Sequence, residues 1–109
     1  MFKSEDGIYT FYVYIITNKH KTVYYTGVTN YLARRLKEHA ENIKLHRKSF
    51  AAKYNCEFLL YYEKFSWIQE AIGREKIIKG WDRKKKLMLI QRINPKFEFL
   101  NYLFPYDEK

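Results

Sequence analysis

The chemistry that this sequence could perform is indicated first by a carboxylate, Glu75, on the apolar side of a predicted helix. At 3.6 residues per turn, the apolar residues of that side are Ile68, Ala71, Ile72 and Ile78. Glu75 falls among them, whereas Glu70 faces water. A buried carboxylate needs a cation, a metal or a hydrogen-bond network, because burying an unpaired charge is costly. The pattern leaves open a metal ligand and an ion pair with Lys79, four residues on.

A cation holds a comparable position on an earlier helix. Leu32 and Leu36 define the apolar stripe there, and Arg35 flanks it while Arg34 points to solvent. His39 follows Arg35 by one turn, so both residues are expected along the edge of the helix face that meets the sheet. Arg35 could address a site on the sheet, or it could lay its stem over the core and extend its charge into water.

Two of the eleven tyrosines are separated from the others by their position. Tyr14 and Tyr25 lie on two predicted strands that a tight connection joins, so both can project toward the same patch of sheet. The other tyrosines are explained by ordinary aromatic packing with the hydroxyl at the surface.

Three segments rich in aromatic and β-branched residues predict strands, at residues 11–17, 23–26 and 57–65. The first, FYVYIIT, lacks polar alternation, which favours burial on both faces. The polar turn at residues 18–21 is short enough for the first two strands to form a hairpin. Gly27 is expected to end the second strand in a tight turn.

The segments between and after the strands carry apolar residues at helical spacing, so they are expected to form helices. Asn30 is the expected N-cap of the first helix, Ser66 with Gln69 forms a capping box for a later one, and Pro95 stops the last. The aromatic residues 96–109 are expected to pack back on the domain. The helices are expected over residues 31 to about 40 or beyond, 46–54 as a short helix or irregular crossover, 66 to about 79, and 82–94. This order is α+β with a small, mainly antiparallel sheet.

Charge and length narrow the classes of function. With 109 residues, the chain is expected to form a single domain, residues 1–109. A net charge of +9 favours polyanionic partners, although a soluble basic surface explains it equally well. The residues expected to contact a DNA backbone, or else to form a solvated face, are Lys79, Arg83, Lys84, Lys85 and Lys86.

The single cysteine, Cys56, excludes an internal disulfide and a cysteine-rich zinc site, and it is expected to be a small buried apolar residue. The N-terminal residues lack the apolar region of a signal peptide, and no run approaches the length of a membrane span. A cytoplasmic protein without membrane contact is expected.

Short motifs link these residues to a known family. YVY at residues 12–14, ten intervening residues and YTG at residues 25–27 resemble the two motifs that name the GIY-YIG nucleases. Tyr12 replaces the usual Gly, and Thr26 the usual Ile or Val. NYLARRLKEH and AIGREKIIK resemble the family helices that carry the catalytic Arg and the metal-binding Glu. The resemblance covers about residues 11–101 and is closest to short stand-alone members similar to the N-terminal domain of the excinuclease C subunit.

The resemblance implies an α+β fold with a three-stranded antiparallel sheet flanked by helices. It also implies a metal-dependent endonuclease that hydrolyses DNA, possible roles being repair and recombination, with one Mg²⁺ or Mn²⁺ held by Glu75. In that scheme Arg35 stabilises charge on the phosphate, Tyr25 is the general base, Tyr14 positions it or the phosphate, and His39 orients water or phosphate. Asn94 is the candidate for an Asn that the family shows after the last helix.

Two alternatives remain open. The altered first motif is compatible with a catalytically inactive nucleic-acid-binding module of the same fold. A plain interaction subunit is the other, with Glu75 paired to Lys79 and the aromatic C-terminal segment docked on a partner. Both alternatives predict that Glu75 holds no metal.

Overall fold

A three-stranded antiparallel sheet forms the centre of the computed structural model, which describes residues 10–106. The strands are β1 (Phe11–Thr17), β2 (Tyr24–Thr29) and β3 (Phe58–Phe65), in the order β2-β1-β3. β1 is the middle strand, and its residues from Val13 onward are buried on both faces of the sheet. The three predicted strands and the hairpin between the first two are therefore confirmed.

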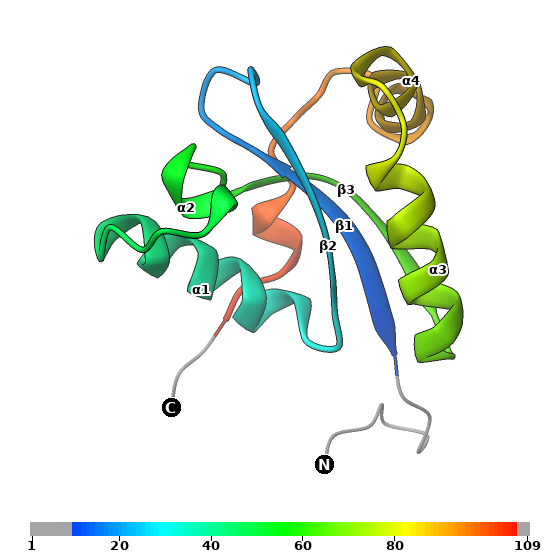
Figure 1. The fold of residues 1–109 in the computed structure, drawn as a ribbon, viewed down its shortest axis with the longest axis horizontal. Helices are drawn as coiled ribbons and strands as arrows, with labels where there is room; N and C mark the ends of the chain where they lie inside the picture. The colour runs from blue at the N-terminus through cyan, green and yellow to red at the C-terminus, as the bar shows by residue number, and fades with distance from the viewer. Residues whose placement is uncertain (1–9, 107–109) are drawn as a thin grey trace.

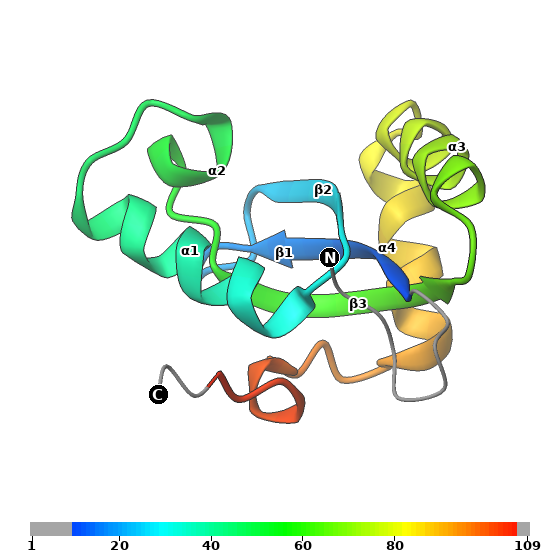
Figure 2. The ribbon, with the colours of Figure 1, turned by 90° about the horizontal axis from the view of Figure 1, so that it is seen from below.

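Helices cover both sides of this sheet. In Figures 1 and 2, α1 and α2 lie on one side, and α3 and α4 lie on the other. Their bounds are α1 Leu32–Lys44, α2 Phe50–Lys53, α3 Ile68–Lys79 and α4 Arg83–Ile93, followed by a 3-10 turn at Asn101–Leu103. The expected α+β fold, with the sheet flanked by helices, is confirmed. Within residues 10–106, no helix has the length and apolar character needed to span a membrane.

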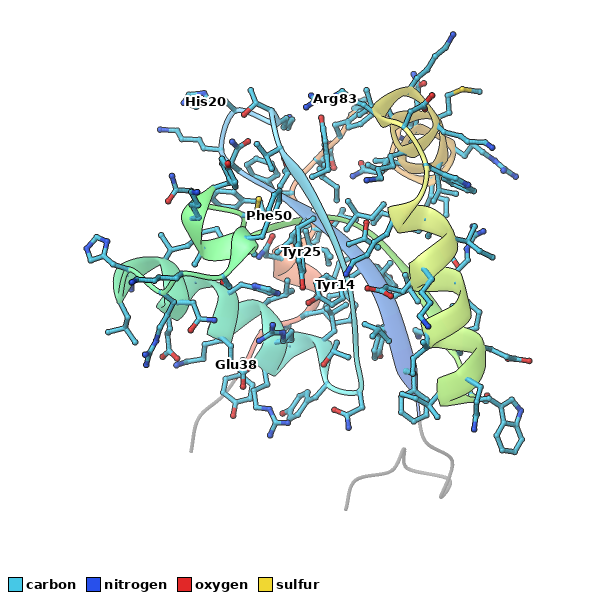
Figure 3. The ribbon with its side chains drawn as sticks, viewed as in Figure 1. Tyr14, His20, Tyr25, Glu38, Phe50 and Arg83 are labelled. Atoms are coloured by element: carbon cyan, nitrogen blue, oxygen red, sulfur yellow. The ribbon has the colours of Figure 1, made fainter. Side chains whose placement is uncertain are left out.

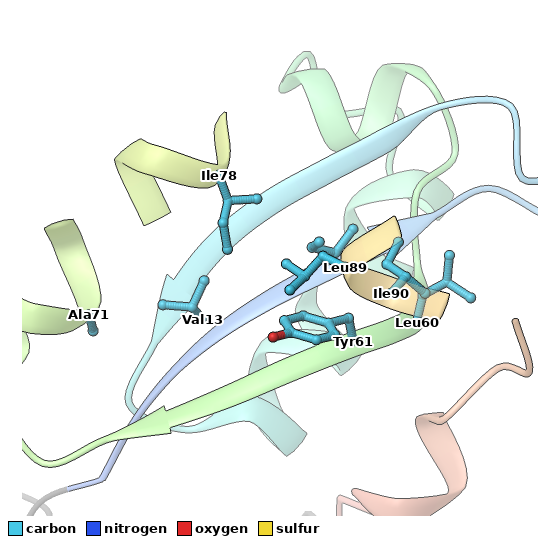
Figure 4. Packing of buried hydrophobic residues seen from close by; sticks show 8 residues of the cluster. Val13, Leu60, Tyr61, Ala71, Ile78, Leu89 and Ile90 are labelled. Carbon is cyan, nitrogen blue, oxygen red and sulfur yellow. The ribbon is translucent and has the colours of Figure 1, made fainter. Parts of the chain in front are cut away.

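Alternation along β1 divides the core into two clusters. Val13 and Ile15 point to the α3 and α4 side, and the cluster there includes Leu60, Tyr61, Ala71, Ile78, Leu89 and Ile90 (Figure 4). Tyr14 and Ile16 point to the α1 and α2 side, where they pack with Leu32, Leu36, Ala51, Cys56 and Leu59. Cys56 is buried, as expected. The sheet thus separates two cores, each of which contains one buried tyrosine, Tyr61 on the α3 and α4 side and Tyr14 on the α1 and α2 side.

Two of the expected helix caps are wrong by a residue or more. α1 begins at Leu32, and Asn30 does not cap it; the hydroxyl of Thr29 instead accepts a hydrogen bond from the backbone N–H of Tyr31 at 3.2 Å. α3 begins at Ile68, so Ser66 does not form the expected capping box. In both places the preceding strand or its connection extends further than local sequence preference indicates, and the helix starts later.

Gly27 was also expected to end β2, but the strand continues to Thr29. Gly27 pairs with Tyr14 across the hairpin, and a Cβ atom at position 27 would lie 2.5 Å from the Tyr14 hydroxyl oxygen. Glycine is needed here because the Tyr14 ring crosses directly over the neighbouring backbone.

Two asparagine side chains cover the outer edge of β3 (Phe58–Phe65) at its start. The Asn94 amide donates to the carbonyls of Leu60 (3.0 Å) and Glu98 (2.9 Å), and its oxygen accepts from the Glu98 N–H. Asn101 accepts from the Leu59 N–H at 2.8 Å and donates to the Glu57 carbonyl at 3.0 Å. The C-terminal segment therefore packs back on the sheet as expected up to residue 106, while residues 107–109 of that prediction lie outside the described residues.

Replacing Gly27 by Ala is expected to lower the free energy of unfolding by about 2 kcal/mol, because the added methyl group overlaps the Tyr14 ring. Urea denaturation of the purified variant measures this change. Gly73→Ala is the matched control: position 73 lies within α3, has open space around it, and should become more stable by about 0.5 to 1 kcal/mol. Equal stability changes in the two variants would contradict the proposed steric cause.

Candidate active site

A hydrogen bond between Tyr14 and His39 lies at the centre of the α1 side of the sheet. The Tyr14 hydroxyl oxygen is 2.8 Å from Nε2 of His39, and only 1% of Tyr14 is exposed. His39 is fully buried as well, whereas the sequence placed it along the edge of the helix face. His39 does meet the sheet, as expected, but it lies inside that helix face instead of at its edge, because the polar end of the Tyr14 ring needs a partner in the core.

Burial determines the protonation of this pair. It raises the pKa of the Tyr14 phenol well above its usual value, and the positive charge of Arg35 counteracts only part of that rise. Burial also lowers the pKa of His39 to about 4, with the Arg35 charge acting in the same direction. At neutral pH, Tyr14 therefore keeps its proton and His39 is uncharged. Tyr14 is thus equipped to form hydrogen bonds rather than to act as a phenolate.

Tyr25 joins the pair from β2. It lies opposite Ile16 in the hairpin, two residues from the Gly27 that faces Tyr14, so both tyrosine side chains project from the same face of the sheet. The ring centroids are 6.5 Å apart for Tyr14 and Tyr25, and 5.6 Å apart for Tyr25 and His39. Figure 3 shows the two tyrosines between α1 and α3, and Tyr25 is the more exposed of the two.

Arg35 occupies the position next to the buried stripe that the helical period predicts. Its side chain is 34% exposed, against 51% for Arg34. Nη1 of Arg35 is 3.0 Å from Oε1 of Glu38, a residue that sequence reasoning did not single out (Figure 3). The spacing of three residues on one helix was the available signal for this pair. Glu38 fixes one side of the guanidinium, which leaves further N–H groups for a ligand.

Glu75 approaches from the other side of the sheet, on α3. The expected apolar stripe is narrower than predicted, since Ile68 and Ile72 are exposed and only Ala71 and Ile78 are buried. The Glu75 side chain is 12% exposed and lies 2.7 Å from Nζ of Lys79. The hydrogen bond with Glu75 raises the pKa of Lys79.

Lys79 connects Glu75 to the tyrosines. Its Nζ atom is 5.7 Å from the centroid of the Tyr25 ring while it contacts Glu75. α3 packs on the opposite face of the sheet from Tyr25, so the contact passes around β2, which is the edge strand. The two sides of the sheet thus contribute to one group of polar side chains.

The donor set offers a metal ion a single carboxylate. Among residues 10–106, no three His, Cys, Asp or Glu side chains converge as they do in a closed metal site. Glu75 is mostly buried and carries one cationic partner, Lys79. Such a carboxylate fits an ion that keeps several waters and shares its shell with a phosphate, as Mg²⁺ commonly does. It does not fit a structural metal.

The remaining residues predicted from the sequence are Asn94 and the basic residues of α4, and they lie outside the group formed by the tyrosines, His39, Arg35 and Glu75. Arg83 donates to the Thr22 carbonyl at 2.6 Å and its guanidinium lies 5.3 Å from the Tyr24 ring, beside the hairpin (Figure 3). Asn94 does not join the site, because its amide is used fully by β3 and the C-terminal segment. The remaining basic residues of this set, Lys84, Lys85 and Lys86, follow Arg83 in the first turns of α4.

The sequence and the fold of this chain are similar to those of known proteins. The family described as the GIY-YIG catalytic domain matches residues 10–88. A UPF0213 protein of Clostridium perfringens is 40% identical over 83 residues, which span 72% of this chain and 81% of that protein. The solution NMR structure of a UPF0213 protein from Bacillus halodurans superposes with a TM-score of 0.51 and 29% identity, covering 85% of this chain and 93% of that one.

The neutral state of His39 predicts a loss of stability in acid. In the unfolded chain, His39 takes up a proton near its ordinary pKa of about 6.5, whereas in the folded protein it does so only near pH 4. This difference in pKa adds about 3 kcal/mol to the free energy of unfolding above about pH 6.5. That contribution is lost as the pH falls from about 6.5 to about 4. Urea denaturation at a series of pH values measures it.

His39→Gln is the matched variant for that titration, because it removes the ionisable ring but retains a polar side chain. The carboxyl groups titrate in both proteins, so the difference between their pH profiles isolates His39. Parallel profiles for the two proteins would contradict a depressed pKa at His39.

Proposed function

Since the chain belongs to the GIY-YIG family, we propose that it is an endonuclease that hydrolyses the phosphodiester bonds of DNA. One observation carries the proposal: Tyr14, Tyr25 and His39 converge within 6.5 Å between ring centroids, between the helix that holds Arg35 and the helix that holds Glu75. All five residues lie within the range that matches the catalytic domain of the family. We propose DNA repair or recombination as the process that this cleavage serves.

In the proposed reaction, Arg35 contacts the non-bridging oxygens of the scissile phosphate, where negative charge grows as water attacks. Tyr25, the more exposed tyrosine, is the proposed general base: it gives up its phenolic proton to solvent and, as the phenolate, accepts a proton from the attacking water. Tyr14 retains its proton and, held by His39, orients Tyr25 or the phosphate through hydrogen bonds.

Glu75 is the residue that would hold one Mg²⁺ or Mn²⁺. Such an ion supplies Lewis-acid stabilisation of the phosphate and the leaving oxygen. Lys79 contacts the same carboxylate at 2.7 Å, so an ion and the Lys79 ammonium compete for it. Once displaced, Lys79 would be available to a neighbouring phosphate group.

The basic surface supplies the affinity for DNA in this proposal. Its members are Lys79, Arg83, Lys84, Lys85 and Lys86. With a net charge of +9, the chain would release counterions on binding, and its affinity would fall steeply as salt rises. These contacts position the DNA without reading its bases.

One observation favours a second candidate, a catalytically inactive module that binds nucleic acid. The Glu75 and Lys79 ion pair satisfies the buried carboxylate without any metal. Such a module would bind DNA with the same salt dependence but would not cleave it.

The first test of the nuclease proposal compares Arg35→Ala and Glu75→Gln with the wild type. Both changes are expected to lower cleavage by about 10²-fold or more, because each removes a group that stabilises charge in the transition state. Nicking of single-stranded, branched and duplex DNA, with Mg²⁺ or Mn²⁺ present, measures this loss.

Neighbouring residues provide matched controls for these variants. Arg34 is adjacent to Arg35 and more exposed, and Glu70 lies on α3 in the exposed first turn. Arg34→Ala and Glu70→Gln should retain cleavage within about threefold, since both side chains are exposed and the helical period turns them away from the sheet. A protein without cleavage on any of the three substrates, or equal cleavage in all variants, would end the nuclease proposal.

A second test concerns the competition at Glu75. Lys79→Met is expected to strengthen Mn²⁺ binding about two- to fivefold, because it removes a partly exposed ion-pair partner from the carboxylate. Titration of Mn²⁺ without DNA, followed by electron paramagnetic resonance, measures the affinity directly. Lys76→Met is the control, since Lys76 is an exposed lysine of the same helix. Equal affinities in the two variants would exclude competition between Lys79 and the ion.

A further inference from the structure

A pocket of about 360 Å³ opens between α2, the β1–β2 hairpin and the start of α4. Two cations and three aromatic rings dominate its wall. The lining residues are Val23, Tyr24, Phe50, Tyr54, Arg83 and Lys86. None of these residues takes part in the chemical step proposed above, although Arg83 and Lys86 belong to the basic surface.

Two of the aromatic side chains of the pocket are exposed to solvent. Phe50 is 52% exposed and Tyr54 is 41% exposed, and their ring centroids are 4.9 Å apart. The exposure is not explained by a loosely held helix: Ala51 and Ala52 anchor α2 in the core, and Ser49 caps it by accepting from the Ala52 N–H. The helix therefore holds the Phe50 ring at the surface in a fixed position. Large exposed apolar groups of this kind mark binding surfaces.

The pocket is contiguous with the proposed catalytic tyrosines. The Phe50 ring stacks on the Tyr25 ring with 6.4 Å between centroids and 27° between planes. Tyr25 in turn lies 6.5 Å from Tyr14. Figure 3 shows Tyr14, Tyr25 and Phe50 following one another along β2, with Arg83 farther on beside the hairpin. A ligand group in the pocket would thus lie one ring away from Tyr25.

The cations at the rim are positioned by the fold. Arg83 is held by its hydrogen bond to the Thr22 carbonyl and by the Tyr24 ring beneath it. Lys86 is partly buried one turn further along α4. A fixed guanidinium beside aromatic faces suits a ligand that carries both a flat ring and a phosphate.

We propose that Phe50 and Tyr54 stack an unpaired base of single-stranded DNA, while Arg83 and Lys86 contact its phosphate. In a duplex the faces of the bases are covered by their neighbours, so only a single strand or an unpaired segment offers a face to these rings. The inference rests on the proposed nuclease function for its ligand, and it specifies the substrate: a DNA strand with at least one unstacked base beside the scissile phosphate.

Binding without cleavage tests this proposal. Fluorescence anisotropy in EDTA would compare a thymidine oligomer of about twelve nucleotides, an abasic sugar-phosphate oligomer of equal length, and a duplex. Phe50→Leu keeps an apolar side chain but removes the ring face, and it is expected to weaken binding of the thymidine oligomer about tenfold and that of the duplex less than about twofold.

The abasic oligomer separates stacking from a general disturbance of the fold. The wild type should bind it about tenfold more weakly than the thymidine oligomer, whereas Phe50→Leu should bind the two with similar affinity. Phe50→Trp, which retains a ring face, should behave as the wild type. Tyr102→Leu is the matched control, because Tyr102 is an exposed aromatic residue outside the pocket.

Equal affinity of the wild type for the thymidine and abasic oligomers would overturn the proposal. An equal loss of single-stranded and duplex binding in Phe50→Leu would also overturn it. Because cleavage is absent from the assay, the two proposals fail separately. Base-dependent binding in a protein that never cleaves would reject the nuclease alone, and cleavage without base-dependent binding would reject the pocket alone.

Discussion

The buried hydrogen bond between Tyr14 and His39 is the constraint around which the site is built. A phenol inside the core must have a polar partner, because leaving it unpaired would cost about 1 to 3 kcal/mol. α1 meets this need with His39, and that contact fixes the rotation of α1, which carries Arg35 one turn earlier. The absence of a side chain at Gly27 lets the Tyr14 ring lie where His39 can reach it. A single polar contact thus links the middle strand, the edge strand and the first helix.

The second organising feature is that the site lies at the edge of the sheet. Tyr25 stands on the α1 side, whereas Glu75 and Lys79 come from a helix that packs on the other side. They meet because β2 has no further strand beyond it in the sheet, so a long side chain can pass around it. The contact between Lys79 and Tyr25 therefore depends on β2 being an edge strand of the sheet.

The periodicity of the sequence correctly predicted those features that are determined within a single helix or strand. It located the three strands, distinguished Arg35 from Arg34, and placed Glu75 in a largely buried position with Lys79 as its neighbour. It failed where distant segments meet. The burial of His39 depends on the Tyr14 ring, and Gly27 lies within a strand because of that same ring. Asn30 and Ser66 were also predicted as helix caps, but α1 and α3 begin later than these residues. The extended strands and their connections overrode the local capping preference at both places.

The asparagine amides at the outer edge of β3 have a consequence for how copies of the chain behave toward one another. An amide side chain carries the same donor and acceptor as a peptide group, so Asn94 and Asn101 take the place of a fourth strand without adding one. The open backbone groups of Glu57, Leu59 and Leu60, which could pair with a strand of a neighbouring molecule, are thereby occupied. Two side chains therefore protect the first part of the β3 edge, in a sheet rich in aromatic and β-branched residues, from pairing with another copy of the chain.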